Sequence, residues 1–239
     1  MSLLTRRRRP QGLDVEQLTW AWQSASLLLG YPDEALRERL PLVRRAVTAL
    51  PATVGDPLGT TLSHLERVDW EEARAAYVET FDTRRRHNLF LTYFAHGDTR
   101  KRGLALLRFK QTYLDAGVVP DEGELPDHLC MVLEFAATVD AEAGRQLLLD
   151  HRAGLELLRI SLGEAGSPWA GAVAGVCATL PPLGEDDWAA VRRLAAEGPP
   201  EEEVGLTPYA TPGFDPGPAA PGPVGGPVPL PMPSFPGAR

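Results

Sequence analysis

Apolar side chains recur at helical spacing along most of the chain. In residues 14–29 one face is apolar, Asp14 is placed to cap the start of this helix, and Gly30 and Pro32 follow its end. The members of that face are Val15, Leu18, Trp22, Ala25 and Leu29. The same spacing predicts further helices at 33–50, 56–68, 69–81, 98–117, 126–140, 142–163, 168–179 and 185–197.

Capping and helix-breaking residues refine these predictions. Asp69 is a predicted N-cap with acidic residues in the turn that follows it, and Pro41 is placed to kink the helix at 33–50. Gly97 permits an unusual backbone angle, and Asp98 is predicted to cap the next helix. No period-two alternation and no internal repeat occurs in the sequence, so we predict a chain without a sheet.

The predicted fold class is therefore all-α, with a single helical-bundle domain of about eight to ten helices at 13–197. Residues 1–12 contain the run "TRRRRP" and are predicted to form a basic, flexible arm. Pro and Gly dominate residues 198–239, a composition that cannot build a packed core. We predict that this C-terminal tail is disordered.

Composition restricts the class of protein. With 44% hydrophobic and 23% charged residues the chain is typical of soluble globular proteins, and its net charge of −8 argues against a nucleic-acid partner. No apolar run reaches the ~20 residues that span a bilayer, so we expect no membrane insertion. The basic N-terminus lacks the apolar region of an export signal, which predicts a cytoplasmic protein. Cys130 and Cys177 are expected to be buried thiols.

The sequence gives little evidence for a catalytic or metal-binding site. The Gly-rich region lacks the strand and helix of a phosphate-binding loop, and no Glu-x-x-His pair of a di-iron site occurs. The histidines have no metal-ligand spacing, and no nucleophile stands in an activated context. We therefore predict a protein that is not an enzyme and holds no metal or cofactor. One alternative stays open, a small helical enzyme or metal-binding protein that uses His96, Asp98, Asp127 and His128.

Charge is distributed unevenly around the middle of the chain. Between 84 and 110 the basic residues are Arg84, Arg85, Arg86, Arg100, Lys101, Arg102, Arg108 and Lys110, with Asp98 as the one acid. Between 111 and 144 the acids are Asp115, Asp121, Glu122, Glu124, Asp127, Glu134, Asp140 and Glu142, without a Lys or Arg. This pattern indicates either elements that attract each other or an acidic surface for a basic amphipathic peptide.

The segment "GELPDHLCMVLEF" at 123–135 places Glu124, Pro126, Asp127 and His128 in front of an apolar run. Pro126 suits the first helical position, and carboxylates are favourable near a helix N-terminus, so capping accounts for these residue types. Two roles remain open for them. In the first, an arginine that follows Asp98 pairs with Asp127 or Glu124 and joins the two helices. In the second, these arginines and carboxylates frame a binding site for a partner.

Two stretches carry a family resemblance: residues 77–117, which contain "HGDTRKRG", and residues 124–137, which contain "ELPDHL". Together they resemble the nitrate reductase delta-subunit (NarJ-type) molybdenum cofactor assembly chaperones, within the all-helical molybdoenzyme chaperone group. The resemblance implies a cytoplasmic chaperone that binds the N-terminal segment of the catalytic (alpha) subunit before that subunit is complete. It also implies that the chaperone supports insertion of the molybdenum cofactor and is not part of the final enzyme. Whether the chaperone also contacts cofactor-delivery proteins stays open.

The resemblance and the charge pattern together suggest which residues bind the partner. These partner-binding candidates are Glu124, Pro126, Asp127, His128 and Glu134, framed by His96, Asp98, Arg100 and Arg102. Carboxylates would meet basic side chains of the client segment, and apolar residues of the following helix would form the groove wall. The candidate wall residues are Leu129, Val132, Leu133 and Phe135, although some of them must instead face the core.

Overall fold

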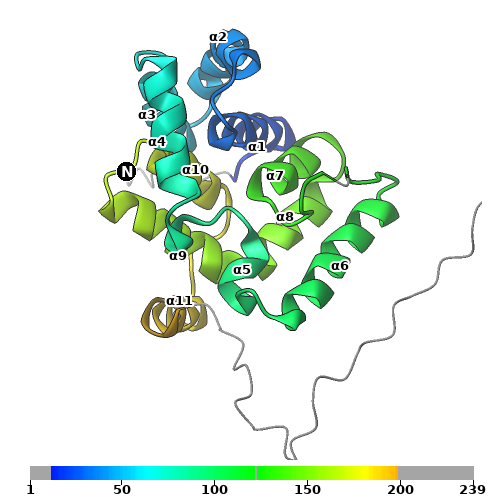
Figure 1. Ribbon diagram of the computed structural model, residues 1–239. Helices are drawn as coiled ribbons and strands as arrows, with labels where there is room; N and C mark the ends of the chain where they lie inside the picture. Colours follow the sequence, from blue (N-terminus) through cyan, green and yellow to red (C-terminus); the bar gives the residue numbers. More distant parts are fainter. Residues whose placement is uncertain (1–11, 122, 199–239) are drawn as a thin grey trace, which may run out of the picture. The chain divides into compact units, whose positions relative to one another are not determined.

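The computed structural model describes residues 12–121 and 123–198, which form eleven α-helices and one 3-10 helix, η1, and contain no strand (Figure 1). The helices are α1 (Val15–Leu29), α2 (Glu34–Ala49), α3 (Ala52–Leu65), α4 (Trp70–Phe81), η1 (Arg85–His87), α5 (Leu91–His96), α6 (Arg100–Asp115), α7 (Leu129–Thr138), α8 (Ala141–Asp150), α9 (Arg152–Glu164), α10 (Ala170–Thr179) and α11 (Glu185–Glu197). The all-α prediction is confirmed. Apart from residues 12 and 198, the predicted arm and tail lie outside the described residues.

Aspartate side chains begin several helices, as the sequence indicates. Asp14 accepts a hydrogen bond from the Gln17 N–H at 2.8 Å, and the Gln17 side chain accepts one from the Asp14 N–H at 3.2 Å. Asp69 accepts from the first turn of α4. Both predicted N-caps are confirmed, because each carboxylate satisfies backbone donors that have no partner within the helix.

Some predicted boundaries are wrong. Helix α2 runs through Pro41 as one element, as the prediction of a helix at 33–50 requires, whereas α3 begins at Ala52 rather than 56. The predicted helix at 142–163 is two helices, because His151 leaves helical backbone geometry between α8 and α9. The apolar spacing continues across this break, so spacing alone does not reveal it. The short helix α5 was also not expected, and the described residues thus contain more helices than predicted.

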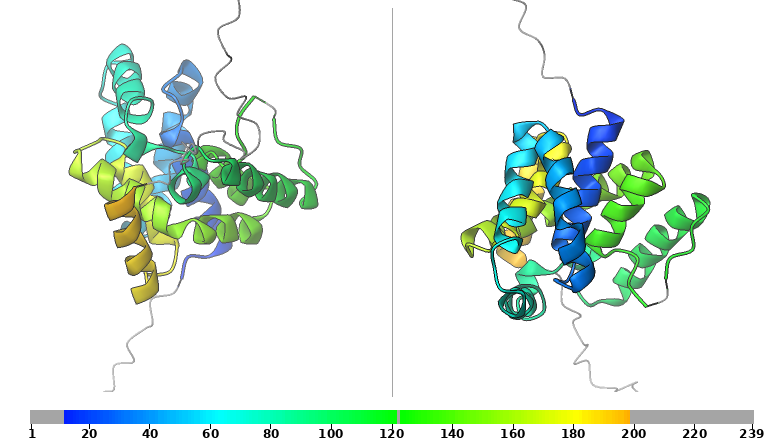
Figure 2. Two further views of the ribbon diagram at one scale, coloured as in Figure 1. Left: turned by 60° about the horizontal axis from the view of Figure 1, so that its bottom comes forward. Right: turned by 90° about the horizontal axis from the view of Figure 1, so that it is seen from above.

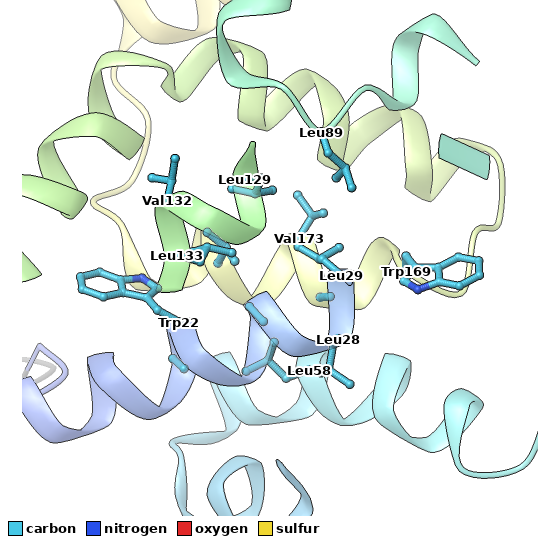
Figure 3. Packing of buried hydrophobic residues seen from close by; sticks show 14 of the residues in the cluster. Trp22, Leu28, Leu29, Leu58, Leu89, Leu129, Val132, Leu133, Trp169 and Val173 are labelled. Carbon is cyan, nitrogen blue, oxygen red and sulfur yellow. The ribbon is translucent and has the colours of Figure 1, made fainter. Parts of the chain in front are cut away.

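The core lies around α1, which packs against α7, α10, α2 and α3. Figure 3 shows buried side chains from α1, α3, α7 and α10, among them Trp22, Leu28 and Leu29 of α1, Leu58 of α3 and Leu133 of α7. All five are completely buried. Burial of such side chains is the main favourable contribution to folding, at about 1.5–3 kcal/mol each.

Glycine permits the closest helix contact in this core. A Cβ atom on Gly171 of α10 would lie 2.3 Å from the Pro57 carbonyl oxygen of α3. One on Gly175 would lie 2.6 Å from the Leu58 side chain. Helices α3 and α10 therefore approach each other at a distance that no larger residue allows at these positions.

Helix α6 lies at the edge of the helical body, beside α5 (Figures 1 and 2). It buries Phe109 and Tyr113 on one face. A long connection, residues 116–128, leads from its end back to α7. This connection carries four of the nine predicted partner-binding residues, and the others lie on or beside α5, α6 and α7, so these helices together position the candidate site.

Candidate partner-binding site

Two segments far apart in the sequence pair through their backbones. The Leu91 N–H donates to the Asp127 carbonyl oxygen at 3.0 Å, and the Leu129 N–H donates to the Leu89 carbonyl oxygen at 2.8 Å. Phe90 and His128 thus form an isolated antiparallel bridge. Because residues before Leu129 are held in this bridge, α7 starts at Leu129, and the prediction that Pro126 opens the helix is wrong.

The Asp127 carboxylate serves α5 instead of α7. Asp127 is completely buried, and its Oδ2 accepts hydrogen bonds from the Thr92 N–H at 3.1 Å and the Thr92 hydroxyl at 2.5 Å. It thereby satisfies a free donor in the first turn of α5, whose own N-cap, Phe90, offers no side-chain acceptor. At α7 the N-cap is His128, which makes no such bond. Capping of α7 by Asp127 and Glu124 is therefore not observed.

Arg102 joins this arrangement from α6. Its Nε donates to the Thr92 hydroxyl oxygen at 3.1 Å, its Nη2 lies 3.8 Å from Asp127 Oδ2, and its Nη1 donates to Asp98 Oδ1 at 3.2 Å. Its guanidinium also lies 5.4 Å from the centre of the Phe90 ring. The expected pairing of an arginine with Asp127 is confirmed. We refer to Thr92, Asp98, Arg102 and Asp127 as the polar junction.

Asp98 does not cap α6. The N-cap residue is Thr99, without a side-chain cap, and the exposed Asp98 carboxylate pairs with Arg102 instead. The preceding Gly97 does adopt the predicted unusual backbone, with φ of 56°. Within the described residues, Asp127 Oδ1 and Arg102 Nη2 are buried without a hydrogen-bond partner. The junction thus contains an unused acceptor and an unused donor.

His128 lies on the outer side of the junction. Its Nδ1 is 3.4 Å from Glu124 Oε1, within ion-pair range but without hydrogen-bond geometry, and its ring is 5.1 Å from the Phe90 ring. Burial lowers the pKa of His128 below its ordinary value, and the neighbouring Glu124 and Asp127 carboxylates oppose this shift. Burial thus favours the neutral imidazole of His128, while the Glu124 side chain is half exposed.

A groove of about 210 Å³ lies between α7 and the connection that follows α6. Its mainly apolar lining consists of Tyr113, Val118, Val119, Pro120, Met131, Phe135, Thr138 and Val139, and the acids Asp121 and Glu134 complete it. Both acids are exposed. We refer to this feature as the acidic groove. Tyr113 links it to the polar junction, since its hydroxyl donates to the Pro126 carbonyl oxygen at 2.7 Å.

Most of the candidate wall residues belong to the core, and one borders the groove. Leu129, Val132 and Leu133 are completely buried and face the core instead of the surface. Phe135 is the member of the predicted set that borders the acidic groove. Helix α7 is apolar on several faces, so spacing does not distinguish its core-facing residues from those beside the groove.

The remaining predicted site residues lie in different places. His96 ends α5 and borders a separate cavity of about 200 Å³, together with Arg108, Asp150 and His151. Arg100 is exposed on the first turn of α6. The structure therefore brings Asp98, Arg102 and Asp127 together and places Glu124, Pro126 and His128 beside them. Glu134 lies in the acidic groove, and His96 lies apart from the other candidates.

Several site residues had no sequence signal. Thr92, Phe90 and Tyr113 stand in ordinary apolar or helical contexts, and only the fold brings them to Asp127 and Pro126. Among residues 12–121 and 123–198, no three His, Cys, Asp or Glu side chains gather where a metal ion could bind. Neither described cysteine forms a disulfide, and no described helix has the length and apolar content of a membrane span.

Comparison with known proteins identifies relatives of this region. The family model of the nitrate reductase delta subunit matches residues 47–175. The nitrate reductase-like protein NarX of Mycobacterium tuberculosis is 46% identical over 170 residues, 71% of this chain but 26% of that protein. The probable nitrate reductase molybdenum cofactor assembly chaperone NarJ of Bacillus subtilis is 34% identical over 173 residues, 70% of this chain and 91% of that protein.

The nitrate reductase molybdenum cofactor assembly chaperone NarJ of Escherichia coli is 34% identical over 148 residues, which is 61% of this chain and 63% of that protein. The chain thus spans about a quarter of the mycobacterial relative and nearly all of the Bacillus relative. The region matched by the family model contains the whole polar junction and the whole acidic groove.

Proposed function

Because the chain belongs to the nitrate reductase delta-subunit family, we propose that it is a dedicated assembly chaperone for a respiratory nitrate reductase. In this proposal it binds the catalytic subunit in the cytoplasm before that subunit is complete. It supports insertion of the molybdenum cofactor and is absent from the final enzyme. The names of the Bacillus and Escherichia relatives, which are molybdenum cofactor assembly chaperones, support this function.

The acidic groove is the observation that carries the proposed binding mode. The N-terminal segment that the resemblance implies as ligand has basic and apolar residues on a short helix. Met131 and Val118 offer apolar contact area for such a helix, and the exposed carboxylates of Asp121 and Glu134 offer partners for its basic side chains. A helix held by one apolar face in a groove is a common mode of peptide recognition.

The polar junction takes a positioning role in this proposal. Asp127 is completely buried, so it does not meet a ligand directly while the junction is closed. It holds the first turn of α5 and, through Arg102, the start of α6. Tyr113 then fixes the Pro126 turn at the edge of the groove. Glu124, half exposed beside this turn, adds a third carboxylate for the ligand.

Calorimetry with the N-terminal peptide of a nitrate reductase catalytic subunit tests the proposal. We expect binding that weakens with rising salt, because the contact is partly electrostatic. The double variant Asp121→Asn/Glu134→Gln should weaken binding about 2- to 30-fold, since exposed ion pairs contribute about 0.2–1 kcal/mol each. Glu16→Gln/Glu38→Gln is the matched control, because it removes the same number of charges from exposed acids on α1 and α2.

Two results would contradict the proposed binding mode. One is the absence of any binding to the peptide at low salt. The other is equal weakening by the groove variant and by Glu16→Gln/Glu38→Gln, which would indicate that only the net charge of the chain matters.

A further inference from the structure

Helix α6 has a second apolar face that stays largely exposed among the described residues. Phe109 and Tyr113 are buried on its inner side, whereas Leu104, Leu107 and Leu114 are 69%, 60% and 42% exposed on its outer side. These three large apolar residues lie on one side of a single helix, so they form a patch and are not scattered over the surface. Figure 2 shows α6 at the edge of the helical body, where its outer side is accessible.

The spacing of the outer residues is that of a helix-pairing seam. Leu104, Leu107, Gln111 and Leu114 follow one another at intervals of three, four and three residues, as the a and d positions of a heptad do. The seam extends over about 15 Å of helix. Gln111 is a polar residue at its centre, and a polar residue at an a position favours one register of pairing over others.

Basic residues border this seam on both sides. In helical projection Lys101 and Arg108 lie on one side of the leucines, and Lys110 lies on the other. All three are exposed, and none of them forms an ion pair with another described residue. Asp115 is the acid of this helix, and it accepts a hydrogen bond from the Gln111 side chain at 2.7 Å. The flanks of the seam are therefore positively charged.

We propose that the outer face of α6 is a docking surface for an amphipathic helix with an apolar seam and acidic flanks, carried by a protein partner. Charge complementarity identifies this occupant, because glutamates beside the partner's seam would meet Lys101, Arg108 and Lys110. The surface is chemically opposite to the acidic groove, which suits a basic ligand. One chain can thus hold two helices of opposite charge at once.

Two other occupants fit the charges less well. A flat anionic lipid surface, unlike a helix confined to the seam, would also meet Asp115, Asp121 and Glu124 at the C-terminal end of the same helix and on the connection after it. A second copy of this chain, paired through α6, would bring basic flanks against basic flanks. Both alternatives place like charges together, which is unfavourable.

Fluorescence anisotropy with two synthetic helices of three heptads tests the proposal on the full chain. Both probes carry leucine at positions a and d. One probe carries glutamate at positions e and g, and the other carries lysine there. Repulsion between these like charges keeps each probe from pairing with itself. The lysine probe also fits the acidic groove, so only the binding that Leu104→Ser/Leu107→Ser removes is compared between the two probes. We expect this leucine-dependent binding to be at least about tenfold weaker for the lysine probe, because the flanks discriminate by charge. Equal leucine-dependent binding of both probes would overturn the proposal.

Substitutions locate the contact. Leu104→Ser/Leu107→Ser should reduce binding of the glutamate probe at least about tenfold, since both leucines lose apolar contact area. Both side chains are exposed in the free chain, so the fold should tolerate the change. Val15→Ser is the matched control, because Val15 is 71% exposed on another helix. A leucine variant that binds as tightly as this control would disprove the location.

Further measurements separate this surface from the alternatives. Leucine-dependent binding to phosphatidylglycerol vesicles without probe binding would replace the proposal with a lipid surface. A leucine-dependent dimer in sedimentation without probe binding would replace it with self-association. The leucine variant should bind the basic client peptide as the unaltered chain does, and loss of that binding as well would show that the two surfaces are not separate.

Discussion

Replacing Asp127 tests whether the polar junction fixes α5 and α6 to the turn before α7. The carboxylate is completely buried and accepts two hydrogen bonds from Thr92, while Arg102 lies 3.8 Å away. Asp127→Ala removes both acceptor contacts and leaves the arginine without its buried counter-charge. Asp127→Asn keeps an oxygen acceptor for Thr92 and removes only the charge.

The expected magnitudes follow from these contacts. A hydrogen bond to a charged group contributes about 1.5–3 kcal/mol, and removing one partner of a buried pair costs about 3–5 kcal/mol. We therefore expect Asp127→Ala to lower the free energy of unfolding by about 3–5 kcal/mol. Asp127→Asn should lower it by about 1–2 kcal/mol, because the separation from Arg102 is long and Arg102 retains Asp98.

Urea unfolding at neutral pH, followed by circular dichroism, measures these values. The slope of the free energy with urea concentration should be similar in all variants, because the same surface is exposed on unfolding. Asp98→Ala is the control, since the Asp98 side chain is 75% exposed and its ion pair should contribute at most about 1 kcal/mol. The reasoning is refuted if Asp98→Ala costs as much as Asp127→Ala, or if Asp127→Asn costs more than Asp127→Ala.

Two further predictions concern packing and pH. Gly171→Ala should lower the free energy of unfolding by about 1–3 kcal/mol, because the new Cβ would meet the Pro57 carbonyl oxygen. Gly163→Ala is the control and should raise the free energy of unfolding by about 0.5–1 kcal/mol, because the space around its Cβ is open. Equal effects of the two substitutions would argue against the close contact. Burial lowers the pKa of His151 below its ordinary value of 6.5, so the unfolded chain binds the proton more readily and stability should be lost as the pH falls below 6.5. The difference in unfolding free energy between the unaltered chain and His151→Gln should then shrink between about pH 7.5 and about pH 5.5, and a constant difference would contradict the assignment.

The fold was predictable where signals are local. Asp14 and Asp69 act as N-caps because a carboxylate satisfies backbone donors two or three residues away, an interaction that the sequence shows directly. The break at His151 was not predictable, because it depends on tertiary contacts. A Cβ on Gly154, three residues later, would lie 2.8 Å from the Phe94 side chain, so α9 packs closely against α5.

The candidate site was predictable in composition but not in arrangement. The charge pattern correctly paired a basic segment with an acidic one, since Arg102 does lie beside Asp127. Capping rules failed for Asp127, because a backbone bridge between distant segments redirected its carboxylate to Thr92. Such long-range pairing produces no regular spacing of residue types in either segment, so the sequence does not reveal it. The groove beside α7 depends on the same bridge and could not be located from spacing.

The backbone bridge between Phe90 and His128 closes a loop that contains α5, α6 and the connection to α7. Few buried contacts hold α6 apart from Phe109 and Tyr113, so this loop should open without unfolding the core. We expect backbone amides of α6 to exchange with solvent before those of α1. The acidic groove exists only while the loop is closed, because Tyr113 and Val118 form part of its lining. The apparent affinity of any groove ligand should therefore scale with the closed fraction, and bound ligand should in turn protect α6 from exchange.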